Sequence, residues 1–360
     1  MGGEKLPAVI LAVVYLMVLG VDAKKCFGLR NGGILDYTGM STKTPYAFLM
    51  TTDQNKVKAD PPGCTPLTFM MLGRHGTRYP SNEDVLVATK LLPVLINATL
   101  TAHEKSNRGT LTPDVLRDFR QWRLPFPMGA DDQIHPIGIE EWHILAETYR
   151  TRFSSFLNKN LENTDIKFIS SYKNRTIASA EAFADGLFGD NGHVISIEDK
   201  TKILRFYKYC QRWKEEIDEN PETSLFEARN FEKSCPFQDM LDRVTAKLGL
   251  DRRLSPLDIE IIYGECQMET AHCPCCKSFY PSTASEQIML DEMNGFHHLD
   301  SETCRTCAMP SPWCKIFSED DLKVLEFWDD LKKYWQDGYG HSLNYEQSCL
   351  LIKELVDQFT

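Results

Sequence analysis

Two arginines flank a histidine in residues 73–80, which read GRHGTRYP. The segment follows an apolar stretch, residues 67–72, whose composition predicts a β-strand. A loop at the carboxyl end of a strand exposes its side chains where open α/β sheets bind ligands. A neutral imidazole can attack phosphorus, while guanidinium groups bind phosphoryl oxygens and stabilise the charge of the transition state. We therefore predict that His75 is a nucleophile and that Arg74 and Arg78 bind phosphate, rather than forming an ordinary basic turn.

A third arginine lies at a similar position farther along the chain. Residues 166–170 have the pattern of a strand, and Thr176–Leu187 has the apolar spacing of a helix. Arg175 therefore lies at a strand-to-helix turn, where the amides of the helix N-terminus add positive potential. Taken alone, this position is also typical of a loop cation with no function.

The segment around His75 resembles the signature of the histidine acid phosphatases, Arg-His-Gly-x-Arg-x-Pro, which residues 74–80 match at every fixed position. Arg78 and Pro80 favour this family over the related phosphoglycerate mutases. Residues 204–206 (LRF) with Cys210, residues 311–314 (SPWC) and residues 334–340 are similar to the multiple inositol polyphosphate phosphatases. The resemblance covers about residues 67–350, apart from one interruption.

This resemblance implies a fold and an activity. The expected fold is an α/β open sheet of the histidine phosphatase type, flanked by helices and carrying a mainly α-helical cap. The expected reaction is hydrolysis of phosphomonoesters on inositol polyphosphates, or on 2,3-bisphosphoglycerate, through a phosphohistidine at His75. In that reaction Arg175 supplies the third phosphate-binding guanidinium, and neither a cofactor nor a metal takes part.

The resemblance leaves the general acid unassigned. The family completes its site with a late histidine motif, His-Asp or His-Ala-Glu, and no such motif follows Cys349. We therefore expect the last part of the sheet domain to be missing. His103-Glu104 and the segment from His298 to Asp300 are weak substitutes. Two hypotheses stay open: a phosphatase, or a truncated isoform or pseudoenzyme that binds polyanions with little turnover.

Residues 1–23 have the pattern of a signal peptide, with Lys5 before an uncharged apolar run and small residues near Ala23. A retained anchor is the alternative, but the run is short of the ~20 residues a spanning helix needs. We expect no other apolar segment long enough to span a bilayer. The expected location is the secretory pathway, either secreted or in a lysosome-like compartment, with the endoplasmic reticulum lumen also open.

The remaining chain is predicted to form two parts. Residues 24–205 and 315–360 would form the α/β phosphatase domain, and residues 206–314 the helical cap. Residues 139–156 and much of 206–250 have helical patterns, and Ser318 begins a helix with a capping box. The cap would carry a cysteine-rich insertion at residues 273–309, where the sequence departs from the family.

Twelve cysteines in a chain with a signal peptide favour disulfides. Cysteine pairs within the insertion, with His272, His297 or His298, could instead hold zinc, but the oxidising compartment favours cross-links. Two glycosylation sequons begin at Asn97 and Asn174. Because Asn174 adjoins Arg175, we expect a glycan at Asn97 and a largely bare Asn174.

The formal net charge of −11 argues against a nucleic-acid surface, which needs a broad excess of lysine and arginine. An acidic protein that binds a polyanion must gather its positive charge in one cleft. The expected partner is therefore a polyphosphorylated small molecule.

Overall fold

The structure is a computed structural model that describes residues 39–44, 64–131, 133–160, 166–189, 195–272 and 311–357. The predicted signal peptide and the cysteine-rich insertion, residues 273–309, lie outside these ranges. The described chain is mostly helical, with one small sheet.

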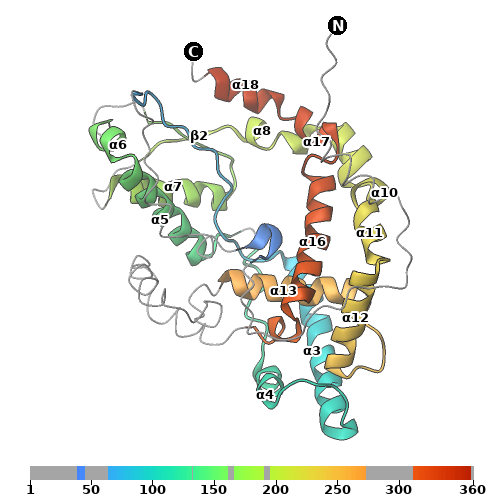
Figure 1. Ribbon diagram of the computed structural model, residues 1–360. Helices are drawn as coiled ribbons and strands as arrows, with labels where there is room; N and C mark the ends of the chain where they lie inside the picture. Colours follow the sequence, from blue (N-terminus) through green and yellow to red (C-terminus); the bar gives the residue numbers. More distant parts are fainter. Residues whose placement is uncertain are drawn as a thin grey trace.

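Two groups of elements make up the structure (Figure 1). The first group, which we call the catalytic lobe, carries the loop of residues 73–80. It also contains α5 (Pro136–Arg152), α6 (Ser154–Asn160), β1 (Phe168–Ser170), α7 (Asn174–Phe188) and β2 (Ile197–Asp199).

The second group, the helical lobe, lies beside the first (Figure 1). Its elements are η1 (Ser41–Lys43), α3 (Asn82–Ser106), α4 (Pro113–Gln121), α10 (Pro221–Ser224), α11 (Phe226–Glu232), α12 (Cys235–Leu248), α13 (Pro256–His272), η6 (Cys314–Ile316) and α16 (Glu319–Gln336). Short elements connect the two groups: α8 (Thr201–Leu204), η3 (Phe206–Tyr209), α9 (Gln211–Trp213), the π-helix η4 (Lys214–Asp218), α17 (Ser342–Glu346) and α18 (Cys349–Asp357).

Each lobe has its own hydrophobic core. The larger core lies among α3, α4, α12, α13, η6 and α16, and its largest fully buried side chains include Phe119, Phe237, Trp313 and Trp328. The smaller core joins α5, α6 and α7 through Ala146, Leu157, Phe183 and Leu187. The larger core contains residues from both sides of residue 206. The domain boundary expected at that residue stays a prediction.

The sheet of the described chain consists of β1 and β2, which pair in parallel with Phe168 opposite Ile197. Helix α7 connects them, as a crossover between parallel strands requires. The strand predicted at residues 166–170 is confirmed from Phe168 onward. The second strand, β2, begins at Ile197.

The strand predicted at residues 67–72 is wrong. A strand needs a neighbour to satisfy its backbone groups, and in the described chain β1 and β2 pair only with each other. Within the segment, Phe69 and Met71 pack on the smaller core while Leu72 is 58% exposed. The apolar stretch therefore packs on one side, without a hydrogen-bonded ladder.

The predicted helices form with small shifts. The helix expected at residues 139–156 is two helices, α5 and α6, with a break at Phe153. The capping box at Ser318 is confirmed, since its Oγ accepts from Asp321 N while the Asp321 carboxylate accepts from Ser318 N. Leu322, Leu325 and Trp328 are buried on the α16 face that meets the core.

Helix α3 is long and apolar enough to cross a membrane by length and composition, so the expectation of no second such segment was too strict. Its Leu92, Leu95 and Ile96 lie in the larger core, which is the arrangement of a core helix. Asn97 is exposed on the same helix, where a glycan has room.

One disulfide joins α13 to η6, between Cys266 and Cys314. The two cysteines are fully buried in the larger core and lie 48 residues apart in the sequence. Among the described residues, Cys64, Cys210, Cys235 and Cys349 have no disulfide partner. The disulfides predicted within residues 273–307 lie outside the described residues and stay a prediction.

Candidate active site

Two backbone amides hold the loop of residues 73–80 against the catalytic lobe. Gly76 N donates to Ser179 Oγ on α7 at 3.0 Å. Thr77 N donates to Glu141 Oε2 on α5 at 2.9 Å, and Thr77 Oγ1 donates to Oε1 of the same carboxylate at 3.1 Å. These bonds fix the loop between α5 and α7 at the two residues that directly follow His75.

The loop also touches the first turn of α5 through two glycines. A Cβ atom built on Gly76 would lie 2.2 Å from Gly138 O, and one built on Gly138 would lie 2.2 Å from Thr77 O. Only glycine allows two backbones to approach so closely. The packing of the loop on α5 thus explains why a glycine follows His75.

His75 is half-buried, and its ring has a defined tautomer. Nδ1 lies 2.8 Å from the carbonyl oxygen of Gly76. A carbonyl only accepts, so Nδ1 carries the proton and Nε2 of the neutral ring keeps its lone pair. The atom that can attack an electrophile is therefore Nε2.

Burial lowers the pKa of His75 to about 4, against the hydrogen bond to Gly76, and the positive charges of Arg175, Arg74 and Arg78 lower it further. The imidazole is consequently neutral at pH values above about 4. A neutral ring among three cations is the state that a nucleophile for phosphate esters requires.

The three predicted arginines converge on His75. The pKa of Arg74 is also lowered, first by desolvation and then by repulsion from Arg78 and Arg175, although its side chain still reaches solvent. An arginine nevertheless stays protonated in a protein. The negative charge of Asp337, at the C-terminal end of α16, acts against this shift and raises the pKa of Arg74. The structure therefore gathers Arg74, Arg78 and Arg175 into one positively charged site.

Arg175 reaches this site from the first turn of α7. Its carbonyl accepts from Ser179 Oγ at 2.8 Å, and the same Oγ accepts from Gly76 N. One hydroxyl therefore links the turn that carries Arg175 to the loop that carries His75. Asn174, the second sequon, is exposed one residue earlier, and its expected lack of a glycan stays a prediction.

Three aromatic rings in edge-to-face contact pack against the loop. Tyr79 lies edge-on to His135, with ring centroids 4.8 Å apart, and His135 meets His272 at 4.4 Å. Burial lowers the pKa of His135 to about 3 and that of His272 to about 4, so both rings are neutral. These rings connect the end of α13 to the loop and act in packing.

The weak candidates for a general acid are not supported by their positions. His103 Nδ1 contacts Thr99 O at 2.9 Å, and its Nε2 accepts from Leu111 N, so the ring closes the end of α3. Glu104 pairs with Arg120 at 2.6 Å on the surface. The segment from His298 to Asp300 lies outside the described residues.

A pocket of about 390 Å³ lies elsewhere, between η4, α10 and α16, and no residue of the loop lines it. Its walls carry Lys332 and Glu260, which bond to each other at 2.6 Å. Because these charges neutralise each other, the pocket offers little positive charge to bind a polyanion. We therefore place the candidate active site at His75 rather than in this pocket.

Sequence comparisons agree with this geometry. Residues 68–360 match the family described as the histidine phosphatase superfamily (branch 2). The chain belongs to this family. Its fold is therefore the α/β histidine phosphatase fold with a helical cap, here mostly helical with a small sheet.

Three similar proteins show how much of the chain is shared. Multiple inositol polyphosphate phosphatase 1 of Drosophila melanogaster is 27% identical over 96% of this chain and 68% of its own length. The protein of the same name from Homo sapiens is 25% identical over 81% of the chain and 55% of its own length. Phytase A of Neurospora crassa is 21% identical over 97% and 65%. The chain thus spans between about half and two thirds of these relatives.

Among solved structures, the crystal structure of the phytase from D. castellii is similar over 79% of this chain and 54% of its own, at 16% identity and a TM-score of 0.46.

Sequence reasoning missed Glu141 and Ser179, which position the loop. Glu141 follows Gly138 by three residues in α5, and a glycine in the first turn of a helix can signal a close backbone contact. Ser179 follows Arg175 by one helical turn, a spacing too common to be a signal. Both roles depend on segments about 60 to 100 residues away.

Proposed function

We propose that the chain hydrolyses phosphomonoesters of inositol polyphosphates through a phosphohistidine on His75. The observation that carries the proposal is a neutral imidazole, with its Nε2 lone pair available, surrounded by three arginine side chains. The names of the similar proteins, multiple inositol polyphosphate phosphatases and phytases, support the substrate class.

The proposed reaction has two steps. His75 Nε2 attacks phosphorus and the ester oxygen leaves with the electrons of the P–O bond, taking up a proton. Arg74, Arg78 and Arg175 hold the non-bridging oxygens and stabilise the charge that builds on them. Water then attacks the phosphohistidine, which releases inorganic phosphate and restores the neutral ring.

A second candidate is a polyanion-binding protein with little turnover. It is favoured by one observation: in the described chain, neither of the considered acids, His103 nor Glu104, is placed to protonate a leaving group. An alkoxide leaves poorly without a proton, and a general acid typically contributes ~10²–10⁴-fold.

We also propose that the protein works in the secretory pathway, in an oxidising compartment. The buried Cys266–Cys314 disulfide supports this, because disulfides persist where thiols are not kept reduced. A glycan at Asn97, exposed on α3, belongs to the same proposal.

Trapping the phosphoenzyme tests the main proposal. Protein incubated with phosphate-labelled inositol hexakisphosphate and quenched in alkali should carry label on His75, since phosphohistidine is stable in alkali and labile in acid. His75→Ala should remove the label and lower turnover by at least about 10³-fold. His143→Ala, which changes a histidine of α5 that lies 3.6 Å from Glu147, is the matched control and should keep both. Label that persists in His75→Ala would show that another residue is the nucleophile.

A further inference from the structure

A short antiparallel bridge connects the loop of residues 73–80 to the segment that leads into α5. Arg78 lies opposite Ile134 in this bridge. Two backbone bonds flank the pair, one from His135 N to Thr77 O at 2.9 Å and one from Tyr79 N to Gln133 O at 3.1 Å. The backbone is therefore fixed on both sides of Arg78, one of the three arginines around His75.

His135 makes two further contacts through its ring. Nδ1 accepts from Ile137 N at 3.3 Å, which caps the first turn of α5. The ring also meets Tyr79 edge-on, with centroids 4.8 Å apart. Because Nδ1 accepts, the proton of the neutral ring is on Nε2. One side chain thus joins the beginning of α5 to the aromatic ring of the loop.

His272 holds the His135 ring from the opposite element, the end of α13. The two rings cross at 81° with their centroids 4.4 Å apart. His272 is only 5% exposed, and its Nδ1 donates to Met268 O at 2.6 Å within the same helix. Phe126 packs on it at 4.9 Å. The His135 ring is therefore packed between the loop and a buried helix end.

Tyr79 connects this packing to the guanidinium of Arg78. Arg78 Nη1 donates to Tyr79 O at 2.7 Å. Since both the ring and the N–H of Tyr79 have fixed partners, its carbonyl oxygen has little freedom to turn, and the guanidinium bonded to it is held as well. An arginine that is already ordered loses less side-chain entropy when it binds an anion.

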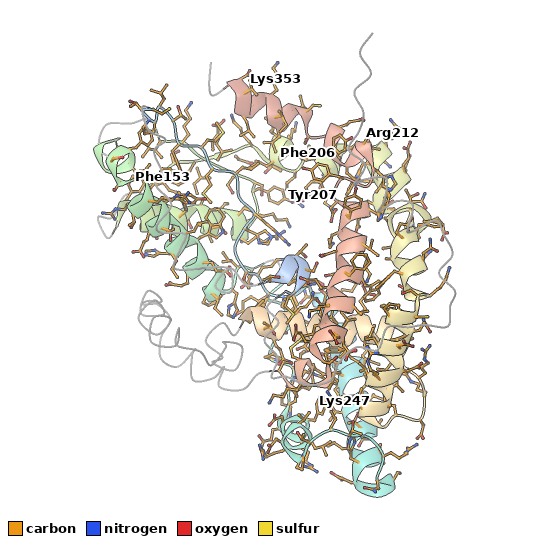
Figure 2. All side chains as sticks on the ribbon, viewed as in Figure 1. Phe153, Phe206, Tyr207, Arg212, Lys247 and Lys353 are labelled. Carbon is orange, nitrogen blue, oxygen red and sulfur yellow. A yellow bond between two sulfur atoms is a disulfide. The ribbon has the colours of Figure 1, made fainter. Side chains whose placement is uncertain are left out.

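The other end of α5 makes a ring contact of the same kind. Phe153 follows the last residue of the helix, and its centroid lies 5.8 Å from that of Phe69, which precedes the loop. Figure 2 shows Phe153 at the end of α5 that lies away from α13. The helix thus packs on the segment of residues 69–79 at both ends, and the contact made by His135 is the one next to Arg78.

We infer that His135 is a positioning residue, which directs Arg78 toward phosphate through the ring and the carbonyl oxygen of Tyr79. The inference rests on the proposed function, because that function makes phosphate the ligand of Arg78. His135 acts through its neighbour and does not itself hold the phosphate.

Phosphate affinity measured in a double-mutant cycle tests this role. His135→Ala should weaken the binding of inorganic phosphate about 2- to 10-fold, because Arg78 must then be ordered on binding. In an Arg78→Ala background the same change should have no further effect, whereas in an Arg175→Ala background it should keep its full effect. Phe153→Leu, which removes the ring contact at the other end of α5, is the matched control and should leave phosphate affinity unchanged in calorimetry.

Two conservative variants separate positioning from general stability. His135→Asn keeps an acceptor for Ile137 N but lacks the ring, so it should melt at a higher temperature than His135→Ala and bind phosphate just as weakly. His135→Phe keeps a ring beside Tyr79 and should bind phosphate almost as the unaltered chain does. Phosphate affinities that simply follow the melting temperatures, or equal losses in the Arg78→Ala and Arg175→Ala backgrounds, would overturn the role of His135.

This test does not depend on turnover. If the cycle gives the expected affinities but the chain forms no phosphoenzyme, the proposed catalysis fails and the positioning by His135 stands. If label appears on His75 while the losses are equal in both backgrounds, the catalysis stands and the positioning fails.

Discussion

Arginine side chains have carboxylate partners in the helical lobe, whereas two arginines of the catalytic lobe have none among the described residues. In the helical lobe Arg252 bonds the two carboxylate oxygens of Asp258 at 2.6 and 2.9 Å, and Arg243 bonds Asp321 at 2.6 Å. In the catalytic lobe, Arg74 and Arg78 have no carboxylate oxygen within 4.0 Å among the described residues, and each repels the other. Paired arginines stabilise a fold, whereas crowded unpaired ones destabilise it and attract an anion. The difference separates the charges that hold the structure from those that we propose bind phosphate.

The largest effect should separate two substrates of the catalytic lobe. p-Nitrophenolate leaves without a proton, but an inositol alkoxide needs one. If no acid serves His75, the chain should cleave p-nitrophenyl phosphate measurably and inositol hexakisphosphate about 10²–10⁴-fold less well than with a donor. Steady-state turnover of both esters checks this. Efficient release of phosphate from the hexakisphosphate would show that an unrecognised donor exists, and Asp300 and Asp337 would be the first to replace.

Exchanging an arginine in each lobe sharpens the comparison directly. Arg175→Ala should lower kcat/KM for p-nitrophenyl phosphate by about 10²–10³-fold, because one group that stabilises the transition state is lost. It should also weaken inhibition by inorganic phosphate. Arg253→Ala, which removes a surface pair with Asp242, should leave both unchanged. Unaltered phosphate inhibition in Arg175→Ala would remove Arg175 from the site.

The pH dependence of the reaction should reflect the lowered pKa of His75 in the catalytic lobe. The pKa of His75 is lowered to about 4, so its neutral, reactive form persists below the ordinary value of 6.5. The acid limb of kcat/KM for p-nitrophenyl phosphate should therefore fall near pH 4 rather than 6.5. A limb near 6.5 would show that the ring is exposed and uncoupled from the arginines.

The same shifts predict how stability changes with pH. His135 and His272 have folded pKa values of about 3 and 4, below the unfolded value, so the unfolded chain binds more protons as the pH falls below about 6.5. Their effect therefore destabilises the fold progressively from pH 6.5 down to these values. Asp258, with its pKa lowered to about 2 by Arg252, contributes stability that is lost only as the pH falls from 3.8 toward 2. Thermal melts across this range should show a first decline that begins near pH 6.5 and a second contribution that begins near pH 3.8 and overlaps its end.

The smallest effect concerns a structural pair alone. Asp258→Asn should lower the free energy of unfolding by about 1–2 kcal/mol, since a charge-assisted bond to Arg252 becomes a neutral one. Activity should not change, because the pair lies in the helical lobe. Denaturant melts and turnover on p-nitrophenyl phosphate together measure this. A drop in turnover without a drop in stability would contradict the division of roles between the lobes.

Local patterns in the sequence singled out the residues that the structure brings together at His75, but not the residues that support them. The order of residues in the loop and the turn at Arg175 are local patterns, so His75 and the three arginines could be named in advance. The strand at residues 67–72 failed because a strand depends on a neighbour elsewhere in the chain. Glu141, Ser179 and the ring of His272 act on the loop from distant segments, and only the folded chain brings them together. The pairing of Cys266 with Cys314, among twelve cysteines, is equally beyond local patterns.

The contact between Gly76 and Gly138 limits how this protein can vary. At each glycine, a backbone carbonyl oxygen of the other segment lies 2.2 Å from the place that a Cβ atom would occupy. An alanine at either position would push the loop away from α5, and no change at the other position could restore the space. Substitution is therefore disfavoured at both positions at once, and one turn farther along α5 the bond of Glu141 to Thr77 adds a second constraint.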